Sequence, residues 1–197
     1  MFCSFVFFLT NNISAISSTQ ILKERLSKIS NFYVKFTQNV TDQEGNSFQK
    51  SNGEIWLEFP NKFKWHVLLP EESFIISTGK EIWFYEPNIK QASVSFLKKI
   101  FKNFSLLSFY RKSNLADYVI NQNRNTFIIH SNKRIYNNIK ELKINILPSG
   151  KITDVTISEN DGLCTKYHFY DYQYNIIFNN QFKFLPPKDT MIDDQRY

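Results

Sequence analysis

The stretch GEIWLEFPNKFKWHVLLP, residues 53–70, contains two alternating segments joined by a turn. In the first segment, Ile55, Leu57 and Phe59 occupy every second position. After the Pro60-Asn61 turn, apolar residues recur at every odd position up to residue 69, with lysines and a histidine between them. Successive side chains of a strand point to opposite faces. The stretch therefore predicts a β-hairpin with one strongly apolar face.

Similar segments lie on both sides of this hairpin. Turn chemistry at residues 42–46, 78–80, 148–150 and 160–162 separates them at hairpin spacing. The segments are evenly spaced, and we expect a single, mainly β domain built on one strongly curved antiparallel sheet, closed or nearly closed. The further strands are expected near residues 32–40, 74–76, 82–85, 92–96, 118–120, 127–130, 142–147, 153–158, 166–172 and 182–184.

Two helical segments accompany the strands. Leu22, Leu26 and Ile29 recur at helical spacing, with Tyr33 continuing the pattern and residues 23–25 charged on the other side. Ser17 and Gln20 have the spacing of a capping box at the start of this helix. A second apolar stretch, residues 97–109, interrupts the strands midway. We expect both helices to pack on the apolar face of the sheet.

The first 17 residues resemble a secretory signal. Residues 2–10 form an apolar run too short to span a bilayer, and Ala15 and Ser17 are small residues spaced for cleavage after Ser17. No lysine or arginine precedes the run, so the leader is degenerate or the true start lies upstream. We expect residues 1–17 to be removed and residues 18–197 to form the mature domain. Cys164 would then be the one cysteine left, which excludes an internal disulfide.

Composition excludes several classes of protein. The net charge of +6 could attract nucleic acid or anionic lipid headgroups, but the lysines are scattered rather than clustered. The three histidines lie in no metal-binding spacing, only five glycines are present, and no nucleophile motif occurs. We therefore expect no metal, no cofactor and no catalysis.

The aromatic share is high at 17%, with 20 Phe and 10 Tyr. A dry core and a lipid cavity use the same residue types, and composition alone favours the dry core.

A family resemblance changes this balance. Residues 26–40 resemble the opening "RL..I..F...F.Q.V" of the outer-membrane lipoprotein carrier family, LolA, with its Asp and Gly turn at Asp42 and Gly45. Residues 53–65 are similar to its "G.LW..RPN.F.W", and residues 79–87 to its "DGK.LW.Y.P", with Gln91 following. Residues 182–187 and 193–196 resemble its tail. The motifs run in order from about Leu22 to Arg196, which is more specific than any one of them.

The resemblance implies an incomplete antiparallel barrel in which helices form a lid over a hydrophobic cavity. It also implies a monomeric periplasmic carrier without a cofactor. Such a carrier takes lipoproteins from the inner-membrane Lol ABC transporter and passes them to the outer-membrane receptor LolB. The expected cavity residues are Phe36, Ile55, Leu57, Phe59, Phe63, Trp65, Phe74, Ile76 and Phe84. The expected lid residues are Leu22, Leu26, Ile29, Ile100, Phe101, Phe104, Leu106 and Leu107.

One position departs from the family pattern. Phe59 stands where the family usually has an arginine that tethers the closed lid, and a phenylalanine cannot donate those hydrogen bonds. Either lid closure here relies on apolar contact, or the lid is looser and the cargo is held differently. Phe63 matches a family aromatic near the barrel mouth that matters for transfer.

Three alternatives stay open. A LolB-like receptor would share the fold, but the chain lacks a lipobox and keeps the carrier tail. For an enzyme that acts on a lipid or envelope polymer, the sequence contains no supporting motif. A nucleic-acid binder is disfavoured by the secretory leader, and salt-dependent binding of oligonucleotides would revive it.

Overall fold

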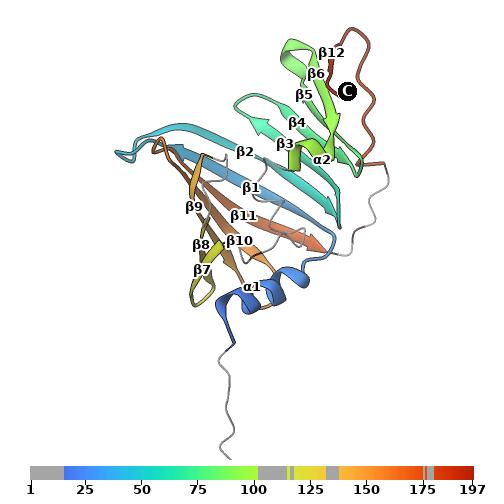
Figure 1. The fold of residues 1–197 in the computed structure, drawn as a ribbon. Helices are drawn as coiled ribbons and strands as arrows, with labels where there is room; N and C mark the ends of the chain where they lie inside the picture. Colours follow the sequence, from blue (N-terminus) through green and yellow to red (C-terminus); the bar gives the residue numbers. More distant parts are fainter. Residues whose placement is uncertain (1–15, 102–114, 116–117, 132–137, 175, 177–179) are drawn as a thin grey trace, which may run out of the picture.

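A computed structural model describes residues 16–101, 115, 118–131, 138–174, 176 and 180–197 (Figure 1). Twelve strands form one sheet in the order β12-β6-β5-β4-β3-β2-β1-β11-β10-β9-β8-β7. The strands are β1 (Phe32–Thr41), β2 (Ser47–Glu58), β3 (Lys62–Leu69), β4 (Ser73–Thr78), β5 (Glu81–Glu86), β6 (Gln91–Phe96), β7 (Tyr118–Asn123), β8 (Thr126–Ser131), β9 (Ile139–Ile146), β10 (Ile152–Glu159), β11 (Cys164–Tyr174) and β12 (Met191–Asp194).

The sheet is open. Within the described residues no pairing joins its edge strands, β12 and β7. All pairs are antiparallel except β12, which runs parallel to β6. The expected mainly β architecture with one strongly curved sheet is confirmed, and the turn segments at residues 42–46, 60–61, 78–80, 148–150 and 160–162 each connect sequential strands.

The curvature can be read from contacts between distant strands. Trp65 on β3 and Tyr167 on β11 have ring centroids 5.4 Å apart, although β2 and β1 lie between their strands. Neighbouring strands are about 4.8 Å apart, so these two side chains meet only because the sheet bends toward them. We call the face that carries these two rings the concave face and the opposite face the outer face.

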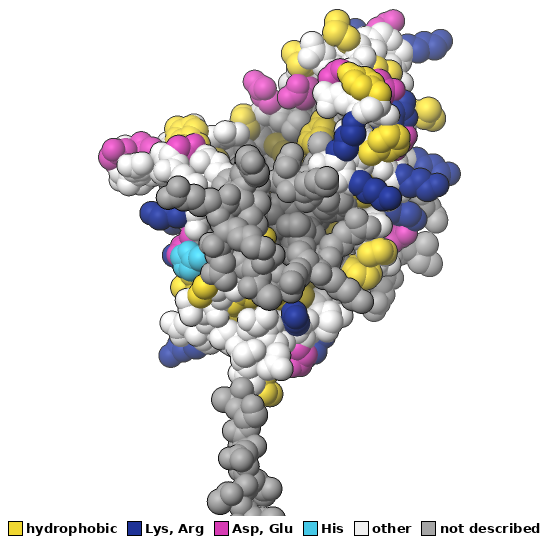
Figure 2. Space-filling view, viewed as in Figure 1, with side chains coloured by type: hydrophobic (Ala, Val, Ile, Leu, Met, Phe, Trp, Pro, Cys, Tyr) yellow, Lys and Arg dark blue, Asp and Glu magenta, His cyan; other side chains and the backbone are white. Residues whose placement is uncertain are grey.

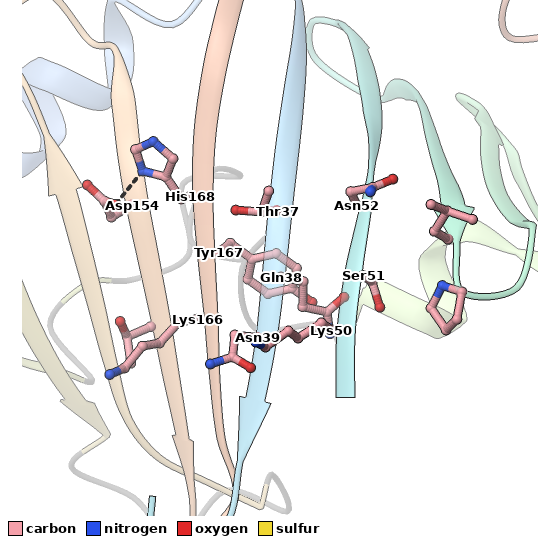
Figure 3. A pocket seen from close by; sticks show the side chains of 13 residues that line it. Thr37, Gln38, Asn39, Lys50, Ser51, Asn52, Asp154, Lys166, Tyr167 and His168 are labelled. Atoms are coloured by element: carbon pink, nitrogen blue, oxygen red, sulfur yellow. Dashed lines mark hydrogen bonds and ion pairs between the residues drawn. The ribbon is translucent and has the colours of Figure 1, made fainter. Parts of the chain in front are cut away.

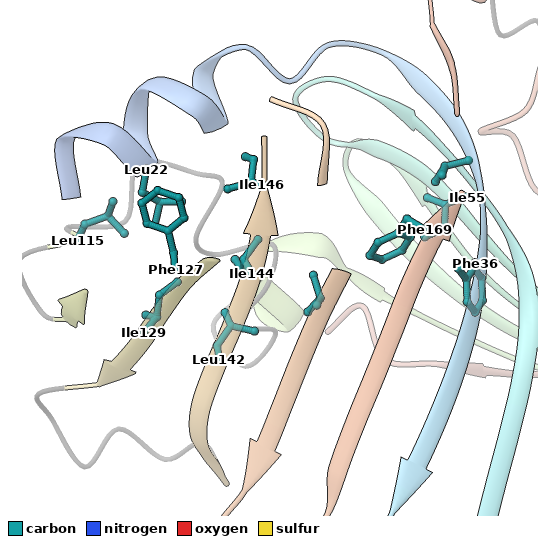
Figure 4. Packing of buried hydrophobic residues seen from close by; sticks show 12 residues of the cluster. Leu22, Phe36, Ile55, Leu115, Phe127, Ile129, Leu142, Ile144, Ile146 and Phe169 are labelled. Carbon is teal, nitrogen blue, oxygen red and sulfur yellow. The ribbon is translucent and has the colours of Figure 1, made fainter. Parts of the chain in front are cut away.

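One large apolar cluster lies on the concave face. It extends from Ile55 on β2 to Phe127 on β8 and includes Leu22 of the first helix (Figure 4). Phe36, Phe127 and Ile146 are completely buried in it. The cluster is the main core of the molecule.

The first helix, α1 (Ser18–Ser27), begins with the expected capping box. The backbone N–H of Gln20 donates to Ser17 Oγ at 3.2 Å, and the Ser17 N–H donates to Gln20 Oε1 at 3.0 Å. The helix ends at Ser27, so Ile29 lies after the helix and Tyr33 belongs to β1. The spacing of apolar residues had predicted that the helical pattern continues through both. Cleavage after Ser17, as the leader pattern predicts, would remove the capping residue.

The predicted strand at residues 182–184 is wrong, and the predicted helical insert is described only in part. Residues 182–184 form no strand; the chain there is irregular, and the last strand is β12 instead. Of the predicted helical insert, α2 (Leu97–Phe101) is described, together with a short 3₁₀ helix, η1 (Pro87–Ile89), before β6. Residues 102–109 lie outside the described residues.

Candidate functional site on the concave face

The cross-strand register places much of the predicted cavity set on the concave face. Leu57 pairs with Phe63, and Ile55 pairs with Trp65, so these four side chains share one face of the central hairpin. Phe84 reaches the same face through β4, because Ile75 pairs with both Trp65 and Phe84. Phe36 also lies there, since it belongs to the same buried cluster as Ile55.

An aromatic group occupies the middle of this face. The Phe36 ring lies 4.9 Å from the Trp65 ring and 6.0 Å from the Tyr167 ring, between centroids. Tyr167 was not among the predicted site residues. Burial raises the pKa of its hydroxyl to about 12, because the phenolate would lose its hydration on this apolar surface.

A second apolar group continues the concave face toward β5. Phe63, Ile82 and Leu97 are buried there, and the partly buried side chains packed against them are Leu57, Ile75 and Phe84. Three serines, Ser73, Ser77 and Ser95, interrupt this part of the face, since their register partners are also concave-face residues. The lining is therefore mainly apolar with a few hydroxyl groups.

Phe74 and Ile76 are placed differently from the prediction. Phe74 pairs with His66, and Ile76 pairs with Lys64, so both side chains lie on the outer face. They belong to a separate apolar cluster with Trp83 and Val94, against which Phe184 of the C-terminal segment packs. The prediction treated the apolar residues of β4 as one set, although adjacent residues of a strand point to opposite faces.

The predicted lid residues are described only in part. Leu22 is completely buried against the main core, and Leu26 and Ile29 pack beside it. Ile100 and Phe101 lie in α2, but their side chains are not described. Phe104, Leu106 and Leu107 lie outside the described residues.

Arg25 is a residue of α1 whose role the sequence pattern missed. Its Nη1 atom donates to the Ile146 carbonyl at 2.6 Å and to Asn125 Oδ1 at 2.9 Å. Its guanidinium also lies 5.2 Å from the centre of the Phe127 ring. The helical pattern had placed Arg25 on the solvent side, whereas it ties α1 to the β7–β8 turn and to the end of β9.

Two hollows open on the concave side of the sheet. One, of about 430 Å³, lies beside the β3–β4 turn and is lined by Gln38, Ser51, Val67 and Glu86 among others. The other, of about 370 Å³, includes Ser73, Ile75, Phe84 and Ser93. Both fall within the size range of pockets that hold small ligands. Among the described residues no group of histidine, cysteine and carboxylate side chains could hold a metal ion.

Residues 27–185 match the family model described as outer membrane lipoprotein carrier protein LolA. The chain belongs to the LolA family. It is 38% identical over 177 residues to the outer-membrane lipoprotein carrier protein of Erwinia tasmaniensis, covering 89% of this chain and 87% of that one. It is 34% identical over 196 residues to the protein of that name from Yersinia pestis, covering 98% and 96%.

A solved structure supports the fold. The crystal structure of an uncharacterized conserved protein from Thermus thermophilus superposes on this LolA family chain with a TM-score of 0.61. The sequence identity is 13%, and the match covers 90% of this chain and 99% of that one. The likeness therefore concerns the fold alone. Among the residues that the structure describes, no helix is both long and apolar enough to span a bilayer.

Phe59, where the family resemblance implies an arginine, lies just beyond the end of β2. Its side chain is 48% exposed, and its backbone N–H donates to Asn31 Oδ1 at 2.9 Å. Asn31 sits between α1 and β1, so this contact fastens the β2–β3 turn to the segment that follows the helix. An exposed aromatic ring thus stands at this end of the sheet, two residues beyond Leu57, whose side chain lies on the concave face.

Proposed function

We propose that this LolA family protein is a periplasmic carrier that binds the acyl chains of lipoproteins on its concave face. It receives them from the Lol ABC transporter of the inner membrane and delivers them to the receptor LolB at the outer membrane. It acts as a monomer and catalyses no reaction. Residues 1–17 serve as the signal that directs it out of the cytoplasm.

The observation that carries the proposal is the apolar lining of the concave face, from Phe36 and Trp65 to Phe63 and Phe84, with hollows beside it. A methylene transferred out of water gains about 0.8 kcal/mol, so a dozen exposed carbons of an acyl chain cost on the order of 10 kcal/mol in water. A curved apolar face can offset most of that cost. A flat face could not surround a chain.

A carrier must also release its cargo, so the binding cannot be too strong. If helical segments cover the apolar face when it is empty, the cargo must displace their contacts, and the net affinity falls accordingly. We assign this covering role to α1 with Leu22, Leu26 and Ile29, and to the segment from residue 97 to residue 109. With Phe59 in place of the usual arginine, closure at this end relies on apolar contact.

The proposal is tested by release of a triacylated lipoprotein from membrane vesicles that contain the transporter. We expect the purified protein to take the lipoprotein into a soluble one-to-one complex. Failure to form any soluble complex, with a folded protein and an active transporter, would reject carriage.

Two neighbouring aromatic residues of β5 provide a matched pair of variants. Phe84 and Tyr85 are both partly buried, but Phe84 lies on the concave face and Tyr85 packs against Phe184 on the outer face. We expect Phe84→Ala to weaken the complex severalfold and Tyr85→Ala to leave it unchanged. Equal binding by both variants would mean that the acyl chains lie elsewhere.

A charge at Phe63 tests the transfer step. Phe63 is 6% exposed and lies at the start of β3, on the concave side. We expect Phe63→Glu to impair loading or transfer to LolB, because a carboxylate there would meet the acyl chains. Circular dichroism checks that the variant is folded, and normal transfer by a folded variant would remove Phe63 from the site.

A further inference from the structure

The outer face of the sheet carries a polar recess that the proposed function does not use. It has a volume of about 900 Å³ and lies over β2, β1, β11 and β10 (Figure 3). Its side chains are mostly hydrophilic, whereas the concave face behind it is apolar. On one side the recess is bordered by Leu69, which is 57% exposed, and by Pro70.

The strand register arranges the recess in two rows. In the first row, Asn39 of β1 pairs with Lys50 of β2 on one side and with Lys166 of β11 on the other. Thr156 of β10 continues this row, because it pairs with Lys166. The second row lies two residues further along each strand and consists of Asn52, Thr37, His168 and Asp154.

The two lysines of the first row supply the free charge of the recess. Both are exposed, and neither forms an ion pair with any residue in the part of the chain that the structure describes. The one carboxylate in the recess, that of Asp154, is engaged by His168 Nδ1 at 2.8 Å. Lys143, the next residue of the first row after Thr156, is paired with Glu141 at 2.9 Å. The recess therefore presents two unneutralised ammonium groups, one on each side of an amide.

We propose that this recess binds the phosphate group of anionic phospholipids at a membrane surface. Lys50 and Lys166 lie two strand spacings apart, about 10 Å between backbones, and their long side chains can both reach one phosphate above Asn39. The amide of Asn39 can donate a further hydrogen bond. Leu69 and Pro70 offer an apolar border to the glycerol and upper acyl carbons.

This inference goes beyond the proposed function and concerns the opposite face of the sheet. The outer face would bring the carrier to a membrane surface, while the concave face holds cargo. The net charge of the protein alone does not predict a membrane-binding site in the recess, because the remaining lysines are spread over the chain. Vesicle binding is measured without cargo. A protein that does not bind vesicles could therefore still carry lipoproteins, and a protein that carries no lipoprotein could still bind vesicles.

The test measures binding of the purified protein to vesicles by co-sedimentation at low salt. One set of vesicles contains equal parts of phosphatidylglycerol and phosphatidylcholine, and the other contains phosphatidylcholine alone. A lysine near an anionic surface contributes about fivefold to partitioning. We therefore expect binding to the anionic vesicles only, and a loss of about 25-fold in the double variant Lys50→Gln/Lys166→Gln.

Two further variants separate the site from net charge. Lys140→Gln/Lys188→Gln removes the same two charges from exposed lysines that do not line the recess, and it should bind nearly as well as the wild-type protein. Asn39→Asp changes almost no volume but places a carboxylate between the two lysines. We expect it to weaken vesicle binding by about fivefold or more. Melting temperatures check that all variants are folded.

The possible outcomes decide between sources of the ligand. Equal loss in the two double variants would show a general charge effect and overturn the site. Equal binding to both kinds of vesicle would overturn the role of the phosphate charge. Saturable binding of inorganic phosphate or of an oligonucleotide, without binding to anionic vesicles, would also overturn the proposal, because the recess would then serve a different ligand.

Discussion

Gly53 shows how a single position constrains the central hairpin. A Cβ atom built on it would lie 2.1 Å from the His66 carbonyl oxygen and 2.8 Å from the Phe36 ring. The glycine thus allows the ring of Phe36 to approach β2 closely, beside Trp65. This close approach explains the glycine that precedes the Ile55 segment, which the sequence showed only as part of a motif.

We expect Gly53→Ala to destabilise the protein by about 2 kcal/mol or more, because either the ring or the β3 backbone must move. Gly45→Ala is the control. Its φ of +86° is costly for alanine, but nothing lies within 4 Å of the added atom. It should therefore cost about 1–2 kcal/mol through backbone conformation alone. Urea unfolding measures both, and a smaller loss for Gly53→Ala than for Gly45→Ala would contradict this packing.

The raised pKa of Tyr167 predicts a specific pH dependence. In the unfolded chain the hydroxyl loses its proton near pH 10, whereas in the folded protein it keeps the proton up to about pH 12. The folded state therefore binds more protons in this window, and the stability that Tyr167 contributes is present below pH 10 and lost as the pH rises toward 12. We expect Tyr167→Phe to lose less stability than the wild-type protein between pH 10 and 12, by about 2 kcal/mol. Identical pH profiles would place the hydroxyl in water.

Individual residues also show where sequence reasoning reached its limit. Alternation assigned Ile55, Leu57, Phe63 and Trp65 to one face correctly, because long regular strands have a clear period. It failed at Phe74 and Ile76, because residues 74–76 are apolar without a break and no period can be read from them. The register with β3 decides their face, and register is a property of the pair rather than of one strand.

At the scale of elements, the C-terminal segment covers the outer-face cluster. The Phe184 ring lies 5.3 Å from that of Trp83 and 5.2 Å from that of Tyr85, between centroids. Further along, β12 pairs with β6, and Arg196 Nη1 donates to Glu81 Oε1 at 2.6 Å. The alternation of Phe182 and Phe184 had suggested a strand, but these rings are placed by contact with the sheet and not by pairing.

We expect Phe184→Ala to destabilise the protein by about 2–3 kcal/mol, somewhat less than for a fully buried phenylalanine. It should also increase the binding of an apolar fluorescent dye, because the cluster around Trp83 loses its cover. The neighbouring variant Leu185→Ala is the control, since Leu185 is 89% exposed. It should change stability by less than about 0.5 kcal/mol. Similar effects of the two substitutions would mean that the segment is not held by Phe184.

At the scale of the whole molecule, the sheet divides the aromatic residues into two groups on opposite faces. Trp65 lies on the concave face among the core residues, whereas Trp56 and Trp83 lie on the outer face. Figure 2 shows hydrophobic side chains at the surface over β6, β12 and the C-terminal segment, where several apolar residues are exposed. High aromatic content alone could not reveal this division, since a packed core and a ligand-binding face have the same composition.

The sequence allowed the positions of most strands along the chain to be predicted, because turn residues mark their ends. The degree of bending was not predictable in the same way. It depends on contacts such as that between Trp65 and Tyr167, which join strands that are about 100 residues apart in the chain. The lid assignments depend on such long-range contacts as well.

The central claim is that acyl chains bind on the concave face, and the three tryptophans allow a direct measurement. Bromine atoms on an acyl chain quench indole fluorescence only in close contact. We expect brominated acyl chains to quench the variant Trp56→Phe/Trp83→Phe, which keeps Trp65, and to leave Trp65→Phe/Trp83→Phe, which keeps Trp56, unquenched. Quenching of Trp56 alone, or equal quenching of both variants by bound chains, would contradict the claim.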